Sequence, residues 1–169
     1  RFAVGGDADI SAVGNVLVNQ GVQNPVANTV AGNLDMAAPE IALQRTVVTG
    51  NADLNAVTSL TGQVEVGGTT ALDADGGSID LNLASTGLAT ASANDIIIRG
   101  INNNPLTFAQ LTTDFGGAII NGSGTVTIQN ATLANAGEVR SSVGNVIINQ
   151  ATVTTGNLFV EADNDARLG

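Results

Sequence analysis

Three aspartates beside a Gly-Gly turn are the residues of this sequence best suited to bind a metal ion. Asp73, Asp75 and Asp80 surround Gly76 and Gly77, and carboxylate oxygens are the hard ligands that calcium prefers. Their spacing matches neither a full EF-hand loop nor the Gly-Gly-x-Gly-x-Asp repeat of calcium-binding β-rolls, and a plain acidic turn accounts for them. We therefore predict no bound metal and no cofactor, with these three aspartates as the calcium candidates.

Residues for other kinds of catalysis are scarce. The sequence contains no His and no Cys, which excludes histidine-based triads, histidine or thiolate zinc sites, and disulfides. A carbohydrate-active enzyme of the polysaccharide lyase or glycosidase type would need three or more carboxylates that converge, usually with a basic residue or a metal. Only Arg99 among the basic residues lies beside a strand and an irregular stretch, where a cleft could form. An ion pair or a solvated side chain is the simpler interpretation of Arg99, so we predict that the protein is not an enzyme.

Outward-facing side chains offer several interaction surfaces. Leu17 and Ile147 stand between Asn residues and either lie under a neighbouring loop or form an apolar stripe for lateral contact. Thr and Asn residues at outward strand positions could form ladders that bind glycan or ice, although ordinary β-propensity also explains them. These residues are Thr125, Thr127, Thr152, Thr154, Asn145 and Asn149.

A short repeated phrase supplies the elements that would hold these side chains. Each copy reads Gly, then Asn or Asp, then apolar residues alternating with other residues, as in Gly6–Ala12, Gly32–Ala38, Gly50–Ala56 and Gly156–Ala162. Alternation with period two places the apolar residues on one face of a β-strand, and Gly with Asn or Asp tolerates left-handed turn conformations. Each copy is therefore predicted to be one turn followed by one strand.

A second phrase alternates with the first. Gly14–Gln20 and Gly144–Gln150 are close copies of each other, and Val22-Gln23-Asn24-Pro25 indicates a longer turn. The alternation predicts a buried core that is stacked between like residues of adjacent coils. Its predicted members are Val16, Ile79, Leu81, Ile98, Ile128 and Ile148.

Successive copies are spaced about 18 to 26 residues apart, which is the range of parallel β-solenoid repeats. We predict an all-β, parallel β-helix of about seven coils, and one domain over 1–169 that is complete or a segment of a longer solenoid. A β-sandwich is the main alternative, but it usually shows buried aromatic residues and varied loops. Aromatic residues make up only 2% of this chain.

The stretch from Asn102 to Gly117 interrupts the pattern. Three Asn residues precede Pro105, and Pro cannot donate to a β-ladder. We predict an excursion from the coil here, with one helical turn at Thr107–Leu111. Phe108 and Phe115 are expected to cover a gap on the flank of the solenoid and to offer an interaction surface.

The net charge of −10 makes nucleic acid and anionic membranes improbable partners. No stretch approaches the roughly 20 apolar residues of a membrane helix, so we expect no membrane insertion. The five basic residues are all Arg, and Lys, a common device against the pairing of sheet edges, is absent.

The phrases at Gly32–Ala38, Gly50–Ala56, Gly76–Leu83 and Gly156–Ala162 resemble the shaft repeats of filamentous haemagglutinin-like adhesins of two-partner secretion and autotransporter systems. The resemblance covers most of the chain outside 102–117 and carries over no functional residue. It implies a right-handed parallel β-helix that is secreted or held at the cell surface.

We therefore expect a structural segment of an extracellular fibre or adhesin, which assembles by stacking with copies of itself or with adjacent modules of one long chain. Glycans or a host surface are the other expected partners. A glycan- or ice-binding module and a carbohydrate-active enzyme are the alternatives.

Overall fold

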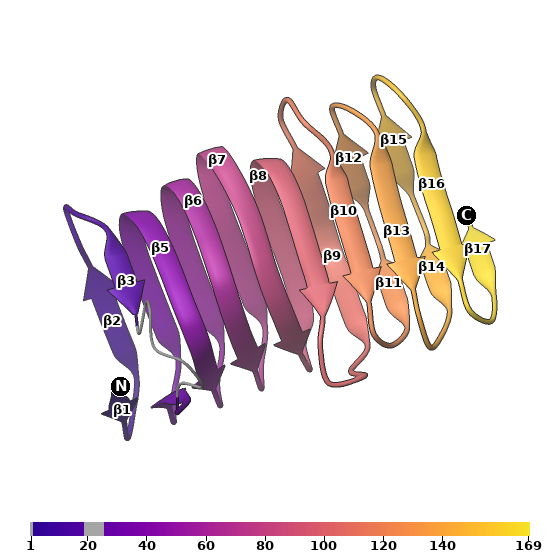
Figure 1. Ribbon diagram of the computed structural model, residues 1–169. Coiled ribbons are helices and arrows are strands. Elements are labelled where there is room, and N and C mark those ends of the chain that lie inside the picture. The colour runs from indigo at the N-terminus through magenta and orange to yellow at the C-terminus, as the bar shows by residue number, and fades with distance from the viewer. Residues whose placement is uncertain (1, 19–25) are drawn as a thin grey trace.

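The computed structural model describes residues 2–18 and 26–169, which form seventeen β-strands and no helix. Every recorded strand pairing is parallel, and the strands wind as one sheet into a solenoid of about seven coils (Figure 1). The chain runs upward at the back and downward at the front as it advances from left to right in Figure 1, so the coil is right-handed. This architecture confirms the all-β solenoid prediction. No helix of the described chain has the length and apolar character needed to cross a membrane.

Each coil contributes strand segments to three faces, which we call faces A, B and C. Face A contains β2 (Ala8–Ser11), the first parts of β5 (Leu34–Val48), β6 (Ala52–Val66), β7 (Thr70–Ser85) and β8 (Leu88–Gly100), the end of β9 (Leu106–Thr113), β12 (Ala131–Leu133) and β15 (Ala151–Val153). Face B contains β3 (Val16–Val18), the middle of β5 to β7, the end of β8, β10 (Ala118–Gly122), β13 (Gly137–Ser141) and β16 (Leu158–Ala162). Face C contains β1 (Ala3–Val4), β4 (Asn28–Val30), the ends of β5 to β7, the start of β9, β11 (Val126–Ile128), β14 (Val146–Ile148) and β17 (Ala166–Leu168).

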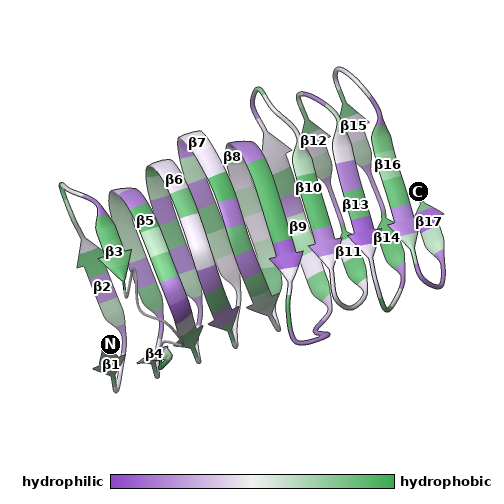
Figure 2. Cartoon of the chain, in the orientation of Figure 1, coloured by the Kyte–Doolittle hydropathy of each residue, from purple (hydrophilic) through white to green (hydrophobic). Residues whose placement is uncertain are grey.

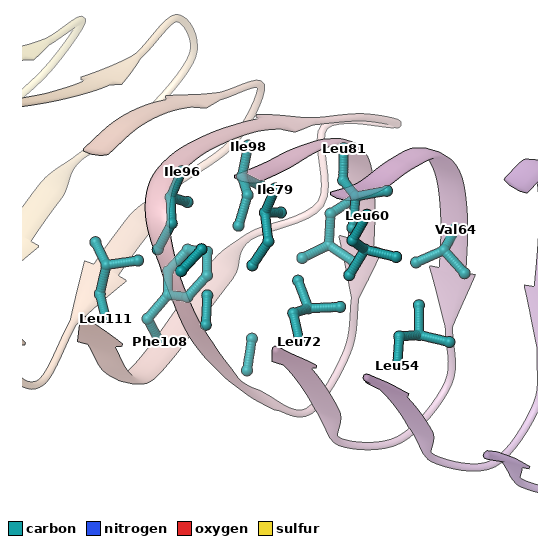
Figure 3. Packing of buried hydrophobic residues seen from close by; sticks show 14 of the residues in the cluster. Leu54, Leu60, Val64, Leu72, Ile79, Leu81, Ile96, Ile98, Phe108 and Leu111 are labelled. Atoms are coloured by element: carbon teal, nitrogen blue, oxygen red, sulfur yellow. The ribbon is translucent and has the colours of Figure 1, made fainter. Parts of the chain in front are cut away.

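The core is built from rows of aliphatic side chains that stack from coil to coil. Leu60, Ile79 and Ile96 are register partners on face B and are all buried. Figure 3 shows such residues from all three faces pointing into the same interior. Branched aliphatic side chains fill this narrow space because each one meets a similar side chain in the next coil.

Five of the six predicted core residues are fully buried, namely Ile79, Leu81, Ile98, Ile128 and Ile148. The prediction was wrong for Val16, which is only partly buried. Val16 lies on β3, which pairs with β5 on one side. On the other side of Val16 the described residues place no further coil, so they cover Val16 from one side.

The Gly-Asn phrase forms a hydrogen-bonded ladder at the corner between faces C and A. The side chain of Asn33 accepts a hydrogen bond from the backbone N–H of Asn51 at 2.9 Å, and Asn51 does the same for Thr69. The accompanying glycines also bond to one another, with Gly50 N donating to Gly32 O at 3.0 Å. A Cβ atom on Gly50 would lie 2.5 Å from Asn33 Oδ1. Glycine is therefore required by the close approach of two coils.

The close contact between coils, and not a left-handed turn conformation, explains most of the glycines at the start of the repeated phrase. Gly6, Gly32 and Gly50 do not have positive φ, although the turn chemistry suggested left-handed conformations. Among the phrase glycines, Gly76 and Gly156 do have a positive φ, of 76° and 92°. The longer turn predicted at Val22–Pro25 lies outside the described residues.

The prediction of an excursion over 102–117 was wrong for most of its length. Only the turn before Pro105 leaves the coil, and Asn102 and Asn103 adopt left-handed conformations there. Leu106–Thr113 is strand β9, in register with β11 and β12, and it contains no helical turn. Phe108 is fully buried within the core instead of covering the flank.

Candidate functional site

The three calcium candidates do not form one site. Asp73 belongs to face A, where its register partners are Asn55 and Ser92. Asp75 is exposed at the corner that follows within β7, and Asp80 lies on face B in an ion pair with Arg99. The corner of the solenoid thus separates Asp73 from Asp80. Among the described residues no group of three or more His, Cys, Asp or Glu side chains is placed to hold a metal ion.

Asp73 nevertheless has an unusual environment. Partial burial is the main cause that raises its pKa above the ordinary value, and the negative charges of Asp75, Asp114 and Asp53 raise the pKa further. Burial and like charges both disfavour the ionised carboxylate. The raised pKa means that ionising Asp73 costs free energy in the folded state, and it does not by itself create a metal site.

Sequence reasoning missed a column of aspartates on the same face. Asp9, Asp35 and Asp53 are register partners in three successive coils. Each occupies the same position of the repeated phrase, so an alignment of the phrases could have predicted this column. Like charges directly opposite each other weaken strand pairing, and this column makes the first half of face A acidic.

The predicted interaction residues are dispersed over the molecule. Leu17 is 56% exposed on face B, whereas Ile147 is half-buried on face C. These two residues therefore do not form one apolar stripe. Phe115 is 79% exposed at the corner between faces A and B, while buried Phe108 is unable to contact a partner.

The predicted Thr and Asn residues also separate. Thr152 continues a face A column with Thr132 and Thr112, whereas Thr127 lies on face C between Thr107 and Ile147. Thr125 accepts a hydrogen bond at the corner from the backbone N–H of Asn145, its counterpart in the next coil. The six residues form no single array.

Face B carries the densest set of charged and polar contacts over its last coils. Arg140 forms ion pairs with Glu138 at 2.5 Å and with Glu161 at 3.1 Å. Its guanidinium also lies over the ring of Phe159, 5.2 Å from the ring centre. The simpler interpretation of Arg99 as a member of an ion pair is confirmed, since it bonds to Asp80.

Two hollows lie on β10, β13 and β16 beside this network. One, of about 680 Å³, is mostly apolar and includes Ile97, Ile119 and Phe159. The other, of about 560 Å³, is lined by polar groups that include Asn121, Arg140 and Glu161. This arrangement could not be predicted from the sequence, because only the coil register brings its residues together.

Comparison with protein-family models, with curated proteins and with solved structures found no match to this chain.

Proposed function

We propose that this chain is a non-catalytic structural segment of an extracellular fibre or surface adhesin, extended by further β-coils at its ends. The observation that supports this proposal most strongly is the unbroken stacking of inward rows along the solenoid. The row of Ile10, Met36 and Leu54 continues in register, coil by coil, through Leu72, Ala91, Leu111 and Ala131 to Ala151. A rod of this kind transmits its register to whatever is stacked on it.

The two terminal coils support the idea of extension. Strands β2 and β3 pair with β5 on one side, and β16 and β17 pair with β13 and β14 on one side, within the described chain. Inward residues of these coils, such as Ile10 and Leu158, are only partly buried. A further coil, from the same chain or another copy, would cover both the apolar residues and the free backbone groups.

The extracellular setting rests on the resemblance to adhesin shaft repeats. Stacked adjacent modules or copies are the partners that this function requires. A surface with net charge −10 disfavours adhesion to nucleic acid or to anionic membranes.

Electron microscopy of the native assembly tests the proposal. We expect rods longer than the roughly 30 to 35 Å that seven coils span at about 4.8 Å per coil. Free particles no longer than this chain alone, observed in material isolated from its native source, would contradict a role in a fibre.

A further inference from the structure

The apolar hollow on face B exposes several large side chains together. Phe159 is 51% exposed and Ile119 is 36% exposed. Both belong to one outward column, which runs in register order through Asp80, Ile97, Ile119, Glu138 and Phe159, so the carboxylate of Glu138 lies between the two apolar side chains. Figure 2 shows β10 and β16 as largely green strands at the front of the molecule, with purple residues of β13 between them. A concave apolar floor with few polar groups around it is typical of a ligand site.

The neighbouring hollow supplies hydrogen-bonding groups at a regular spacing. Arg99, Asn121, Arg140 and Glu161 are successive register partners, one per coil. Their backbone positions are one strand apart, about 4.8 Å. Glu138, Glu161 and Phe159 hold the guanidinium of Arg140 in place, so part of this surface is fixed before any ligand binds.

An oligosaccharide combines the two properties that these hollows require, namely an apolar surface and many hydrogen-bonding groups. A pyranose ring has an apolar C–H surface, which can lie against Phe159 and Ile119. Its hydroxyl groups are both donors and acceptors and can meet carboxylates, amides and a guanidinium. An extended glycan placed along the solenoid axis would meet a polar side chain of the column from Arg99 to Glu161 in each coil.

The charges on this surface select the class of glycan. Carboxylates at Asp80, Asp95, Glu138, Glu161 and Asp163 outnumber the guanidinium groups of Arg99 and Arg140, which are already in ion pairs. The surplus negative charge repels uronate or sulfated polymers. Neutral sugars avoid this repulsion, and carboxylates accept hydrogen bonds well from adjacent hydroxyl groups.

We propose that the outer surface of β10, β13 and β16 binds a neutral oligosaccharide, with Phe159 and Ile119 against its rings and Asn121, Arg140 and Glu161 bonded to its hydroxyls. The five side chains lie on the outward side of face B, whereas the proposed stacking of coils would use the inward residues and the free backbone groups of the terminal coils.

Calorimetry of the 169-residue chain tests this site with four neutral hexasaccharides: cellohexaose, laminarihexaose, mannohexaose and N-acetylchitohexaose. We expect at least one to bind with a dissociation constant in the millimolar range or tighter. Phe159→Ser should weaken that binding roughly tenfold, because it removes the apolar platform. Phe115→Ser is the matched control, since it removes another exposed phenylalanine and should leave the affinity unchanged.

Arg140→Gln provides a second variant if Phe159→Ser lacks the native circular dichroism spectrum, and it should also weaken the binding. Four results would overturn the proposal. They are the absence of heat with all four sugars, an equal loss of affinity in Phe115→Ser, tighter binding of hexagalacturonate than of any neutral sugar, and a Phe159-dependent dimer in sedimentation that shows a second copy to be the occupant.

Discussion

Asp73 offers a test of local electrostatics on face A. Its folded-state pKa is raised by partial burial and by Asp75, Asp114 and Asp53, so the folded state holds its proton more tightly than the unfolded chain does. The stability associated with the protonated form is present below the unfolded pKa near 3.8 and is lost as pH rises through the folded pKa. We predict that Asp73→Asn raises the melting temperature at pH 7 and leaves it unchanged at pH 3.

Asn55→Asp is the complementary variant. Asn55 is the register partner of Asp73 on β6, so this change places a second carboxylate directly opposite the first. Like charges in this position destabilise a strand pair, and the melting temperature at pH 7 should fall. An Asp73→Asn variant that melts below the wild type at pH 7 would show that Asp73 stabilises the fold.

Ile148 tests the inward assignment of a single residue. It is 2% exposed and stacks on Ile128 of the preceding coil. Ile148→Asp would bury a charge without a partner, at a cost on the order of several kcal/mol, which is a large part of the stability of a typical domain. We predict that this variant does not fold, as measured by circular dichroism.

Ile147→Asp is the matched control, because Ile147 is the adjacent residue and points outward. It should retain the native spectrum and melt close to the wild type. An Ile148→Asp variant with native circular dichroism and unchanged melting would refute the inward orientation of this strand.

Alternation along the sequence was sufficient to identify most of the buried residues. Ile79 and Leu81, for example, are separated by an outward Asp80, and both are buried. The alternation did not identify Phe108 as buried, because the order of inward and outward residues shifts by one position within β9. Phe108 pairs with Ala89 and Gln110 pairs with Thr90, so Ala109 is an extra residue opposite the neighbouring strand. A bulge of this kind shifts the period-two pattern and conceals a strand.

At the scale of the strands and turns, the Gly-Asn phrase was recognised as a turn, but its contacts between coils were not. A glycine that is needed for a turn and a glycine that is needed for close contact with the next coil look the same in the sequence. Only the register shows that Gly32 lies against Gly50. The repeated phrase is therefore better explained by the ladder of backbone and side-chain bonds at this corner.

Gly50→Ala tests that explanation. The new Cβ atom would lie 2.5 Å from Asn33 Oδ1 and 2.8 Å from the carbonyl oxygen of Gly32. The backbone of an adjacent coil would have to move, and overpacking of this kind typically costs about 1 to 3 kcal/mol. We predict this loss in the free energy of unfolding, measured by urea denaturation.

Gly14→Ala provides the control for the loss of a glycine. A Cβ atom on Gly14 meets nothing within 4 Å, so this change should be neutral or slightly stabilising. Equal effects of the two substitutions would show that close approach at Gly50 is not the reason for its glycine.

At the scale of the whole molecule, the coil architecture was predictable while the surface columns were not. Copies of the phrases reveal turns and strands, but the number of residues per coil varies. Asn33 and Asn51 stack with a separation of 18 residues, whereas Asp7 and Asn33 stack with a separation of 26. The polar column from Arg99 to Glu161 could therefore not be assembled without the register, and neither could the hollows beside it.

The inward residues of the two terminal coils allow a test of end-to-end stacking. Val160 on β16 points inward and is partly buried, as is Phe2 before β1. If another copy stacks on these coils, a Lys at either position would place a charge inside the new contact. We predict that the 169-residue chain assembles in a concentration-dependent manner, measured by sedimentation, and that Val160→Lys and Phe2→Lys suppress this assembly.

Phe159→Lys is the control, because it adds the same charge to the outward side of β16 and should leave the assembly intact. A wild-type chain that stays monomeric at high concentration, with both terminal coils protected from hydrogen exchange, would contradict stacking of identical copies, because closed ends leave no backbone groups free to pair.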